Sequence, residues 1–487
     1  MRFWTTIGLI LVLSAVGLTY EIAAGRVLAP FFGTSLLTWT AVIAVVLAGF
    51  SIGNALGGLV AERERGAALR TVRGALVGTA VLSALSPAIL GLAYGWGARG
   101  TVGMFLAVVV AFLPASVLVS LPSPLLARMA VEARPGREGS SLGLVLAAGS
   151  LGAIVGAVGA GFAALPLIGS AATFVGCGAA ALLCVPFVRQ DSAGGLGREE
   201  TTLGLVAALV LAASLAGGPV CRYESGLSCI DVSERAGAVH LYSDRTWQAA
   251  EPSGPLAGAR DLVLPYTRLI WARMERDLGP APVVLFVGGG GYTLPSRLLT
   301  SRPGAEAVAV EIDPLVTGVV RERLPFAGSV IAAEGYDAAV GAAAAEATDG
   351  RRLGIVHADG RVYLNETVRR FDAAVMDAFS SGAVPAHLAT RETYGRLRRI
   401  VDGPVYVNLI DRPDGPLVRG VHAILAGLYP HVEAWEGPVG GSGLANLVIA
   451  ASPAPLAPLA ALPPGYAPVR PTPARAFTDD RGWTGTR

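Results

Sequence analysis

Long apolar runs occupy the first 217 residues and limit what this part of the chain can fold into. Most of them can cross about 30 Å of hydrocarbon, which takes roughly 20 helical residues. The whole chain is only 15% charged, whereas soluble domains carry about 25% charged residues. We therefore expect a polytopic α-helical bundle of six or seven helices in a lipid bilayer. The runs lie near residues 5–29, 38–61, 72–95, 101–127, 141–165, 167–188 and 201–217.

The arginines of this region are concentrated in alternate loops, whereas the intervening loops carry almost only Arg99. Short loops that are rich in arginine stay in the cytoplasm, so we expect the N-terminus inside the cell. The arginines in question are Arg63, Arg65, Arg70, Arg73, Arg128, Arg134, Arg137, Arg189 and Arg198.

Two cysteines, Cys221 and Cys229, follow the last apolar run. A close pair in an extracytoplasmic loop is typical of a disulfide. Seven crossings would place the rest of the chain outside the cell, in agreement with such a bond. If run 201–217 does not cross, the later domain is cytosolic and the cysteines are reduced. The sequence leaves both possibilities open.

The basic residues exclude several chemistries. All 38 are arginine, because the sequence contains no lysine. A GxxxxGK[ST] phosphate loop and a Schiff-base mechanism both need lysine. The net charge of +2 argues neither for nor against a nucleic-acid partner, but the lack of a basic arm and of an aromatic-plus-arginine cluster argues against one. Neither HExxH nor a Cys/His metal spacing occurs, so we expect no metal.

The pattern changes after residue 218 to short apolar runs separated by charged, helix-like segments. Short valine-rich runs of this kind are typical of buried parallel strands. Strands that alternate with helices indicate a doubly wound, Rossmann-like α/β domain. We place it at residues 276–487, after a linker and small β region at 218–275. The expected strands are 283–287, 307–312, 354–358, 373–378 and 405–410.

Four glycines, Gly288, Gly289, Gly290 and Gly291, follow the first of these strands. Acidic residues end the next three: Glu311, Asp359 and Asp377. Ligands of open α/β sheets bind along this edge, where an acid after the second strand holds ribose hydroxyls. The loop lacks the third glycine of GxGxxG, because Tyr292 and Thr293 come next. This departure favours a single nucleoside, such as S-adenosylmethionine or a derivative, over a dinucleotide.

The motifs together resemble the spermidine synthase, or polyamine aminopropyltransferase, family, and more closely its membrane-fused branch. They are VVLFVGGGGYTLP, AVAVEIDP, HADGRVYL, FDAAVMDAFSSGAVPAHLATRETY, FTDD and, in the apolar region, EIAAGRVLAPFFGTSLLTWTAVIAVVLAGFSIGNALGGLVAER. The resemblance implies transfer of an aminopropyl group from decarboxylated S-adenosylmethionine to an amine such as putrescine. It also implies homodimers, by analogy with soluble members.

The resemblance implies roles for individual residues. Glycines 288–291 would lie beside the nucleoside and Glu311 would hold its ribose. Asp359, followed by Gly360, would face the adenine, and Asp377 would help to deprotonate the attacking amine. Looser matches place Gln248 and Tyr266 in the donor and acceptor pockets. His387 falls near the same site.

Two departures keep other functions open. The family has an aspartate within the glycine loop and another three residues after the catalytic one. Here the loop is GGGGYT and the second position is Ser380. Methyl transfer from S-adenosylmethionine is therefore one alternative. Because GGLVAERERG (57–66) looks like a loop of major facilitator transporters, a transporter or sensor whose C-terminal domain only binds a nucleoside or polyamine is another.

Overall fold

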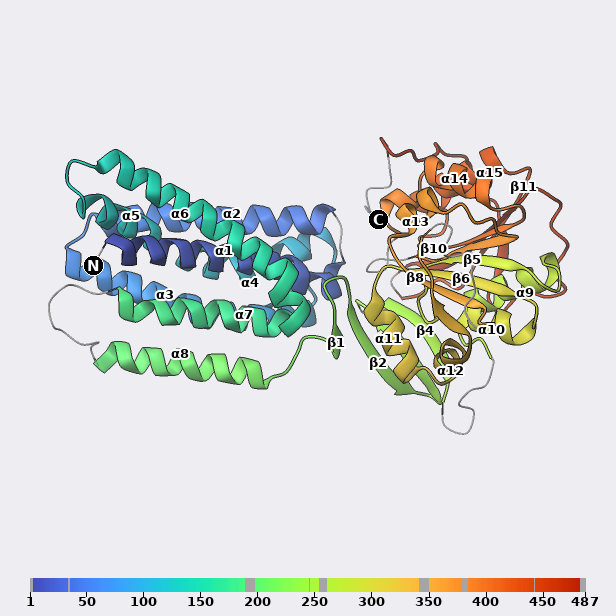
Figure 1. Ribbon diagram of the computed structural model, residues 1–487, viewed down its shortest axis with the longest axis horizontal. Coiled ribbons are helices and arrows are strands. Elements are labelled where there is room, and N and C mark those ends of the chain that lie inside the picture. Colours follow the sequence, from blue (N-terminus) through green and yellow to red (C-terminus); the bar gives the residue numbers. More distant parts are fainter. Residues whose placement is uncertain are drawn as a thin grey trace. The chain divides into compact units, whose positions relative to one another are not determined.

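The computed structural model describes residues 3–33, 36–188, 198–244, 246–253, 261–340, 350–378, 384–441 and 443–481. The chain divides into two compact units, Met1–Cys229 and Ile230–Arg487. The first is a bundle of long apolar helices and the second is an α/β domain (Figure 1). The predicted fold class is therefore confirmed. The domain boundaries at residues 217 and 275 stay a prediction.

Eight α-helices of the described residues belong to the first unit. In the described part of the chain, five stretches are long and apolar enough to cross a membrane: Phe3–Phe32, Leu36–Ala61, Arg65–Gly95, Gly100–Glu132 and Glu138–Phe187. The helices are α1 (Phe3–Phe32), α2 (Leu36–Ala61), α3 (Arg65–Gly95), α4 (Gly100–Ser120), α5 (Pro122–Glu132), α6 (Glu138–Gly159), α7 (Leu165–Cys184) and α8 (Arg198–Ala216).

Two buried clusters mark the two ends of the bundle. The first cluster contains Phe3, Leu69, Val145 and Val188, among others; we call this end the arginine end because the loops at 62–65 and 133–137 adjoin it. The second contains Leu28, Val42, Leu90 and Phe174. We call it the disulfide end.

The clusters fix the direction of the helices after α5. Val145 of α6 lies at the arginine end, Leu165 and Phe174 lie at the disulfide end, and Cys184 lies at the arginine end again. Helices α6 and α7 therefore run in opposite directions. Between them the chain turns through a π-helical segment and Gly169, whose φ of +76° interrupts the helix.

Helix α8 crosses the bundle once more. Glu200 in its first turn pairs with Arg73 Nη1 at 2.7 Å, near the arginine end. Val220, just beyond its last turn, packs against the cluster of the disulfide end. Its 19 residues extend about 28 Å at 1.5 Å per residue, which is close to the thickness of a hydrocarbon core.

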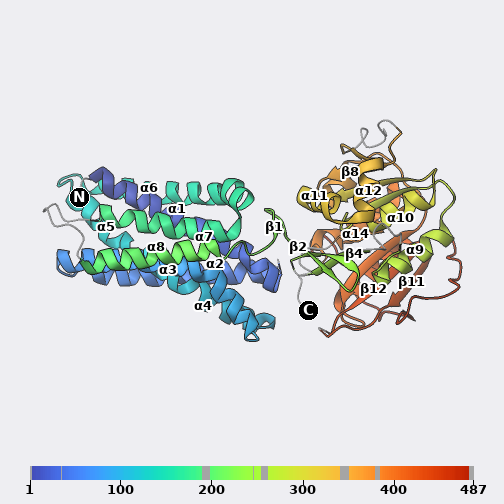
Figure 2. The same cartoon turned by 90° about the horizontal axis from the view of Figure 1, so that it is seen from below.

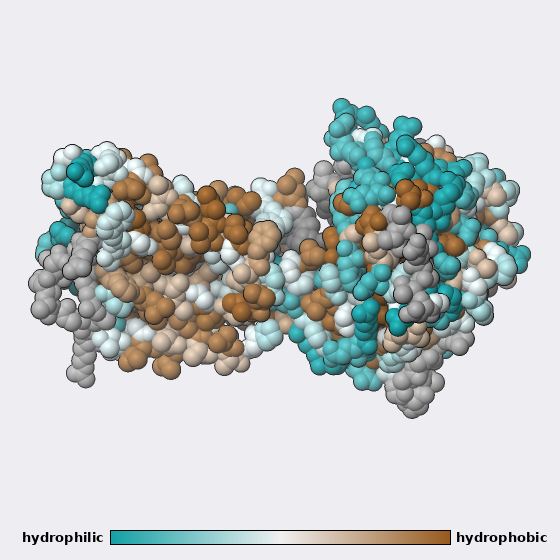
Figure 3. All heavy atoms as spheres, in the orientation of Figure 1, coloured by the Kyte–Doolittle hydropathy of each residue, from teal (hydrophilic) through white to brown (hydrophobic). Residues whose placement is uncertain are grey.

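Small residues let the helices of the bundle pack closely, and apolar side chains form much of its outer surface. A Cβ atom added to Gly152 or Gly156 of α6 would lie 2.1 or 2.2 Å from a carbonyl oxygen of α1. Glycine at this spacing therefore lets the two backbones approach closely. Figure 3 shows many hydrophobic residues on the visible face of the helices. Val102, Leu106 and Leu146 are among the large apolar side chains that are exposed.

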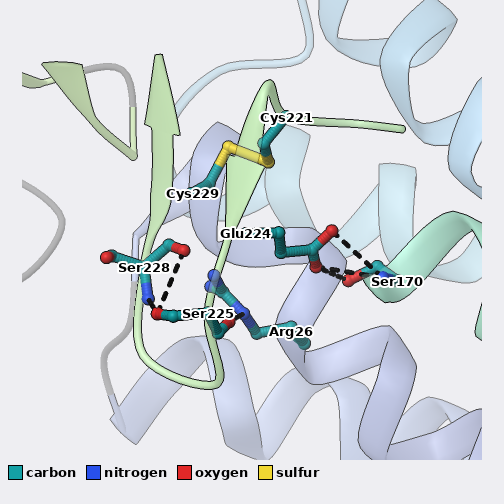
Figure 4. Close-up of a disulfide and its surroundings, with 7 residues drawn as sticks. All are labelled: Arg26, Ser170, Cys221, Glu224, Ser225, Ser228 and Cys229. Atoms are coloured by element: carbon teal, nitrogen blue, oxygen red, sulfur yellow. Dashed lines mark hydrogen bonds between the residues drawn. A yellow bond between two sulfur atoms is a disulfide. The ribbon is translucent and has the colours of Figure 1, made fainter. Parts of the chain in front are cut away.

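A disulfide joins Cys221 and Cys229 on either side of β1 (Tyr223–Glu224) (Figure 4). The loop that it closes is attached to the disulfide end of the bundle. Both carboxylate oxygens of Glu224 accept hydrogen bonds from the Ser170 amide at 3.1 Å, at the start of the helical part of α7. Arg26 Nε of α1 donates to the Ser225 carbonyl at 3.2 Å.

The second unit begins with a small antiparallel sheet. Strands β2 (Cys229–Arg235), β3 (Ala238–Ser243) and β4 (Thr246–Pro252) pair in sequence order. Helix α9 (Pro265–Asp277) follows. Glu251 of β4 is buried, and its carboxylate accepts hydrogen bonds from the amides of Phe326 and Ala327 at 2.8 and 3.0 Å.

The large sheet has the order β13-β11-β12-β10-β9-β5-β6-β8-β7. Six strands from β5 to β10 are parallel, and β11, β12 and β13 join one side in antiparallel fashion. All five expected strands are present, whereas the antiparallel side is not predicted. The bounds are β5 (Val283–Val287), β6 (Glu306–Glu311), β7 (Gly335–Asp337), β8 (Leu353–His357), β9 (Ala373–Met376), β10 (Val405–Asp411), β11 (His431–Glu436), β12 (Ala445–Ser452) and β13 (Ala467–Val469).

Helices connect the parallel strands and cover the sheet. Helix α12 packs against both α10 and α11 (Figure 2). The order of the sheet places β5 between β6, the next strand along the chain, and β9. Such a reversal of strand order is the usual ligand-binding point of an open α/β sheet. The helices are α10 (Thr293–Ser301), α11 (Pro314–Arg323), α12 (Pro325–Glu334), α13 (Gly360–Glu366), α14 (Arg391–Ile400) and α15 (Pro416–Leu428).

Candidate active site

The glycine loop begins where β5 ends, at the reversal point of the sheet. Gly288 has φ of +99°, and a Cβ atom there would lie 2.3 Å from the carbonyl oxygen of Asp377. On the other side of the loop, a Cβ atom on Gly291 would lie 2.1 Å from the Cβ atom of Ala249. Glycine is therefore required for the loop to pass between β9 and β4, beside Gln248.

Tyr292 directly follows the four glycines. Its φ of +54° is left-handed, and its side chain is fully buried. The Tyr292 hydroxyl forms a 2.7 Å hydrogen bond with Thr317 Oγ1. Burial, the largest effect, and the nearby Glu311 carboxylate raise the pKa of Tyr292, so the phenol stays neutral.

Glu311 ends β6 and faces the glycine loop. Its Oε2 accepts hydrogen bonds from the amides of Gly289 and Gly290 at 3.0 and 3.2 Å, and its Oε1 accepts one from Asp313 at 3.0 Å. Burial raises the pKa of Glu311 although these amides oppose the shift. The carboxylate is thus held at the position where a ribose would meet the loop.

Asp359 caps the N-terminus of α13. Its Oδ1 accepts hydrogen bonds from the amides of Arg361 and Val362, and its Oδ2 lies 3.0 Å from Nε2 of His387. A Cβ atom on Gly360 would lie 2.6 Å from a methyl carbon of Val287. Gly360 therefore lets α13 start directly against β5, which brings Asp359 to the same edge of the sheet as the glycine loop.

Asp377 follows β9, next to the glycine loop. The Tyr266 hydroxyl donates to its Oδ2 at 3.0 Å, and Asn408 Nδ2 donates to its Oδ1 at 2.8 Å. Burial raises the pKa of Asp377 to about 6, against the opposing effect of the two hydrogen bonds. A carboxylate with a pKa near neutral pH is suited to accept a proton during a reaction.

A cavity of about 320 Å³ adjoins this carboxylate through Tyr266 and Asn408. The amide of Asn446 donates to Asn408 Oδ1 at 3.0 Å and so extends the hydrogen-bond chain that begins at Asp377. The polar lining consists of Thr246, Gln248, Tyr266, Asn408, Asn446 and Tyr466. The remaining lining consists of Trp247, Leu264, Pro265, Ile410 and Pro438.

The structure brings most of the predicted site residues to one edge of the sheet. Gln248 and Tyr266 line the cavity, Tyr266 donates a hydrogen bond to Asp377, and Glu311 accepts hydrogen bonds from glycines 289 and 290. His387 bonds Asp359 and is not part of the described cavity lining. Ser380 lies outside the described residues.

Asn408 and Asn446 were not predicted. Asn408 is the single polar residue within the apolar run VYVNLI, before Asp411. Because a buried amide needs hydrogen-bond partners, this isolated position is a signal that sequence reasoning could have used. Asn446 lies on β12, directly across from Ile410 in the antiparallel pair. No sequence signal places it there, since that strand was not predicted.

Comparison with known proteins identifies curated relatives that match most of the chain. A Streptomyces coelicolor protein, polyamine aminopropyltransferase 1, is 25% identical over 427 residues, covering 81% of this chain and 73% of the relative. Polyamine aminopropyltransferase 2 of the same organism is 27% identical over 458 residues, covering 87% and 74%. Both matches are longer than residues 230–487, so they extend into the helical unit.

Among solved structures, a probable spermidine synthase from Corynebacterium glutamicum overlaps 54% of this chain and 97% of its own, with 16% identity and a TM-score of 0.42. No protein-family model matches the chain.

The curated relatives define the class of the protein, an enzyme of the type that transfers alkyl groups. The chain is similar to polyamine aminopropyltransferases along most of its length, and the similarity includes its N-terminal helical region.

Proposed function

We propose that the α/β unit transfers an aminopropyl group from decarboxylated S-adenosylmethionine to an amine acceptor. The observation that carries this proposal is Asp377, a partly buried carboxylate whose pKa is raised to about 6 and which is hydrogen-bonded to Tyr266 and Asn408 of the cavity wall. The names of the curated relatives support the same reaction. The roles of the individual residues are part of the proposal.

The reaction needs a base and a positioned nucleophile. The amine nitrogen forms a bond to the propyl carbon next to the sulfonium as the carbon–sulfur bond breaks, and methylthioadenosine leaves. The acceptor arrives as an ammonium, and the Asp377 carboxylate accepts one of its protons so that the nitrogen has a free lone pair for the attack. The product leaves as a secondary ammonium, which balances the charge and the protons. Each Asp377 oxygen accepts one protein hydrogen bond, so each keeps a lone pair that can face the amine.

The donor fits the glycine loop and Glu311. Backbone amides of Gly289 and Gly290 point at the same carboxylate oxygen, and bound ribose hydroxyls would take up this position. The loop has no room for a side chain at Gly288 or Gly291, whereas the space beside Gly290 is open and this glycine is partly exposed, so a nucleoside would approach the backbone there. Asp359 would contact the adenine through Oδ2, the oxygen that now lies beside His387.

We also propose that the helical unit crosses the membrane several times. Its five long apolar stretches and apolar outer surface support this placement (Figure 3). The α/β unit is then tethered to the bilayer by α8. Methyl transfer from S-adenosylmethionine is the second candidate, because the loop GGGGYT offers no acid to the amine of a decarboxylated donor.

The two candidates are separated by their products. Purified protein in detergent is given either decarboxylated S-adenosylmethionine or S-adenosylmethionine, each with a mixture of primary amines. Mass spectrometry then identifies the nucleoside product. We expect methylthioadenosine from the first donor only. Formation of S-adenosylhomocysteine from the second donor would instead show a methyltransferase.

A further inference from the structure

We infer that the acceptor is a primary amine with one positive charge and a neutral, hydrogen-bonding remainder, and not a dicationic diamine. This inference rests on the proposed aminopropyl transfer. It follows from the wall of the cavity beside Asp377. Among the described residues that line the cavity, none is acidic or basic.

Two segments outside the described ranges adjoin lining or catalytic residues along the chain, and their sequences contain no acid. The segments 254–260 (GPLAGAR) and 379–383 (FSSGA) precede Leu264 and follow Asp377 in the chain, and neither contains Asp or Glu. A diamine bound at Asp377 would therefore bring its second ammonium into a neutral wall. A charge that loses its water without gaining a partner is costly.

The neutral groups of the wall match a different molecule. Gln248 and Asn446 present amides, and Tyr466 presents a phenol. Amides can both donate and accept hydrogen bonds, which suits a hydroxyl or carbonyl at the far end of the acceptor. Trp247 and Ile410 add apolar surface for the carbon chain between the two ends.

A matched pair of amines tests the inference. Putrescine and 4-aminobutan-1-ol have the same four-carbon chain and differ at one end, an ammonium or a hydroxyl. With decarboxylated S-adenosylmethionine, we expect kcat/KM for the amino alcohol to exceed that for putrescine at least tenfold. A tenfold preference for putrescine would overturn the inference.

Binding of the two amines is measured separately, so that a failure of the acceptor inference can be told apart from a failure of the proposed reaction. If neither amine yields methylthioadenosine, the proposed reaction fails, whereas calorimetric titration of both amines still compares their affinities. Tighter binding of the amino alcohol supports the neutral pocket, and tighter binding of putrescine refutes it.

A charge introduced into the wall provides the complementary test. Asn446→Asp should shift the ratio of the two kcat/KM values at least tenfold towards putrescine. Asn446→Leu loses the same amide donor without gaining charge, so it should not favour putrescine. An unchanged ratio in Asn446→Asp would show that the second charge never reaches this wall.

A second inference comes independently from the disulfide. We infer that the α/β unit lies on the extracytoplasmic side of the membrane. The disulfide loop is fixed to the disulfide end of the bundle by Glu224–Ser170 and Arg26–Ser225 contacts (Figure 4). Disulfides persist in oxidising compartments and are rare in the cytosol.

The arginine end of the bundle carries the sequence signal for the cytoplasmic side. The loops with Arg63 and Arg65, and with Arg134 and Arg137, adjoin the arginine end, and arginine-rich short loops remain in the cytoplasm. Helix α8 runs from the arginine end to the disulfide end, and the α/β unit follows it in the chain. If the α/β unit is on the extracytoplasmic side, the donor and the acceptor must both be present on that side of the membrane.

Cysteine labelling decides the side. Glu275→Cys places a thiol on the exposed side of α9, and Glu64→Cys places one in the loop before α3. With a membrane-impermeant maleimide on sealed cells, we expect labelling of Glu275→Cys at once and of Glu64→Cys only after permeabilisation. The reverse pattern would overturn the inference, as would free thiols at Cys221 and Cys229 in protein alkylated before extraction.

Discussion

Replacing Asp377 by Asn should lower turnover and raise stability together. The substitution keeps the shape of the side chain. Its Oδ1 can accept from Asn408, and its new amide can donate to the Tyr266 oxygen, which is able to accept. The two hydrogen bonds that Asp377 now receives therefore have replacements, and the variant should fold.

The expected loss of rate follows from the missing base. General-base catalysis contributes about 10²- to 10⁴-fold, which corresponds to roughly 3 to 5 kcal/mol of activation free energy. We expect kcat to fall by this factor with little change in donor affinity. The assay is methylthioadenosine formation under saturating donor, with donor affinity measured by titration.

The expected gain in stability follows from the pKa. Burial raises the pKa of Asp377 from 3.8 to about 6, so between these values the folded state holds a proton that the unfolded state has lost. Stability therefore falls as pH rises through this window, by roughly 3 kcal/mol in all. Asn cannot ionise, so the variant should melt several degrees above wild type at pH 8 and close to it at pH 4.

Asp402→Asn is the control. Asp402 is exposed and pairs with Arg370 at the surface, so its loss should leave turnover unchanged. Retained turnover in Asp377→Asn would refute the assignment of the base. A melting temperature at pH 8 equal to or below that of wild type would refute the argument from burial.

Three further predictions follow from the same geometry. Because the base must be deprotonated, kcat/KM should rise with pH through about 6 and then level off; a rate that falls over this range would contradict the role of Asp377. Gly288→Ala should abolish donor binding because its Cβ meets the Asp377 carbonyl, whereas Gly290→Ala, where the space is open, should bind donor more nearly as wild type does in titrations. Burial raises the pKa of Glu251 to about 7, so the stability of the wild type should decrease between pH 5 and 8. The melting temperature of Glu251→Gln should fall less over this range, and an equal fall in both proteins would exclude Glu251 as a cause.

The parallel core of the α/β unit could be predicted because short valine-rich runs leave few alternatives. The run 283–287 coincides with β5, and the end of β9 places Asp377 next to the glycine loop. The apolar runs likewise coincide with the helices of the bundle. In both cases the signal is local, because the apolar pattern of a segment by itself indicates that the segment is buried.

The rest of the site depends on contacts between distant segments. Asn446 reaches the cavity because β12 pairs with β10 in a register that no local pattern specifies. The disulfide between Cys221 and Cys229 could not be predicted, because the sequence leaves open on which side of the membrane the two cysteines lie. That side follows from the directions of α7 and α8, which no local pattern specifies. The hydrogen bond of His387 to Asp359 likewise joins two distant segments, and no local pattern predicts it.

The central claim is that this chain moves an alkyl group from an adenosyl donor to an amine at Asp377. Single-turnover product analysis by mass spectrometry tests it most directly, with wild type and Asp377→Asn incubated with decarboxylated S-adenosylmethionine and 4-aminobutan-1-ol. We predict that wild type forms methylthioadenosine and the aminopropylated amine in equal amounts, and that the variant binds donor but forms both products about 10²- to 10⁴-fold more slowly. Intact donor bound to wild type, with no alkylated amine from any amine supplied, would contradict the claim.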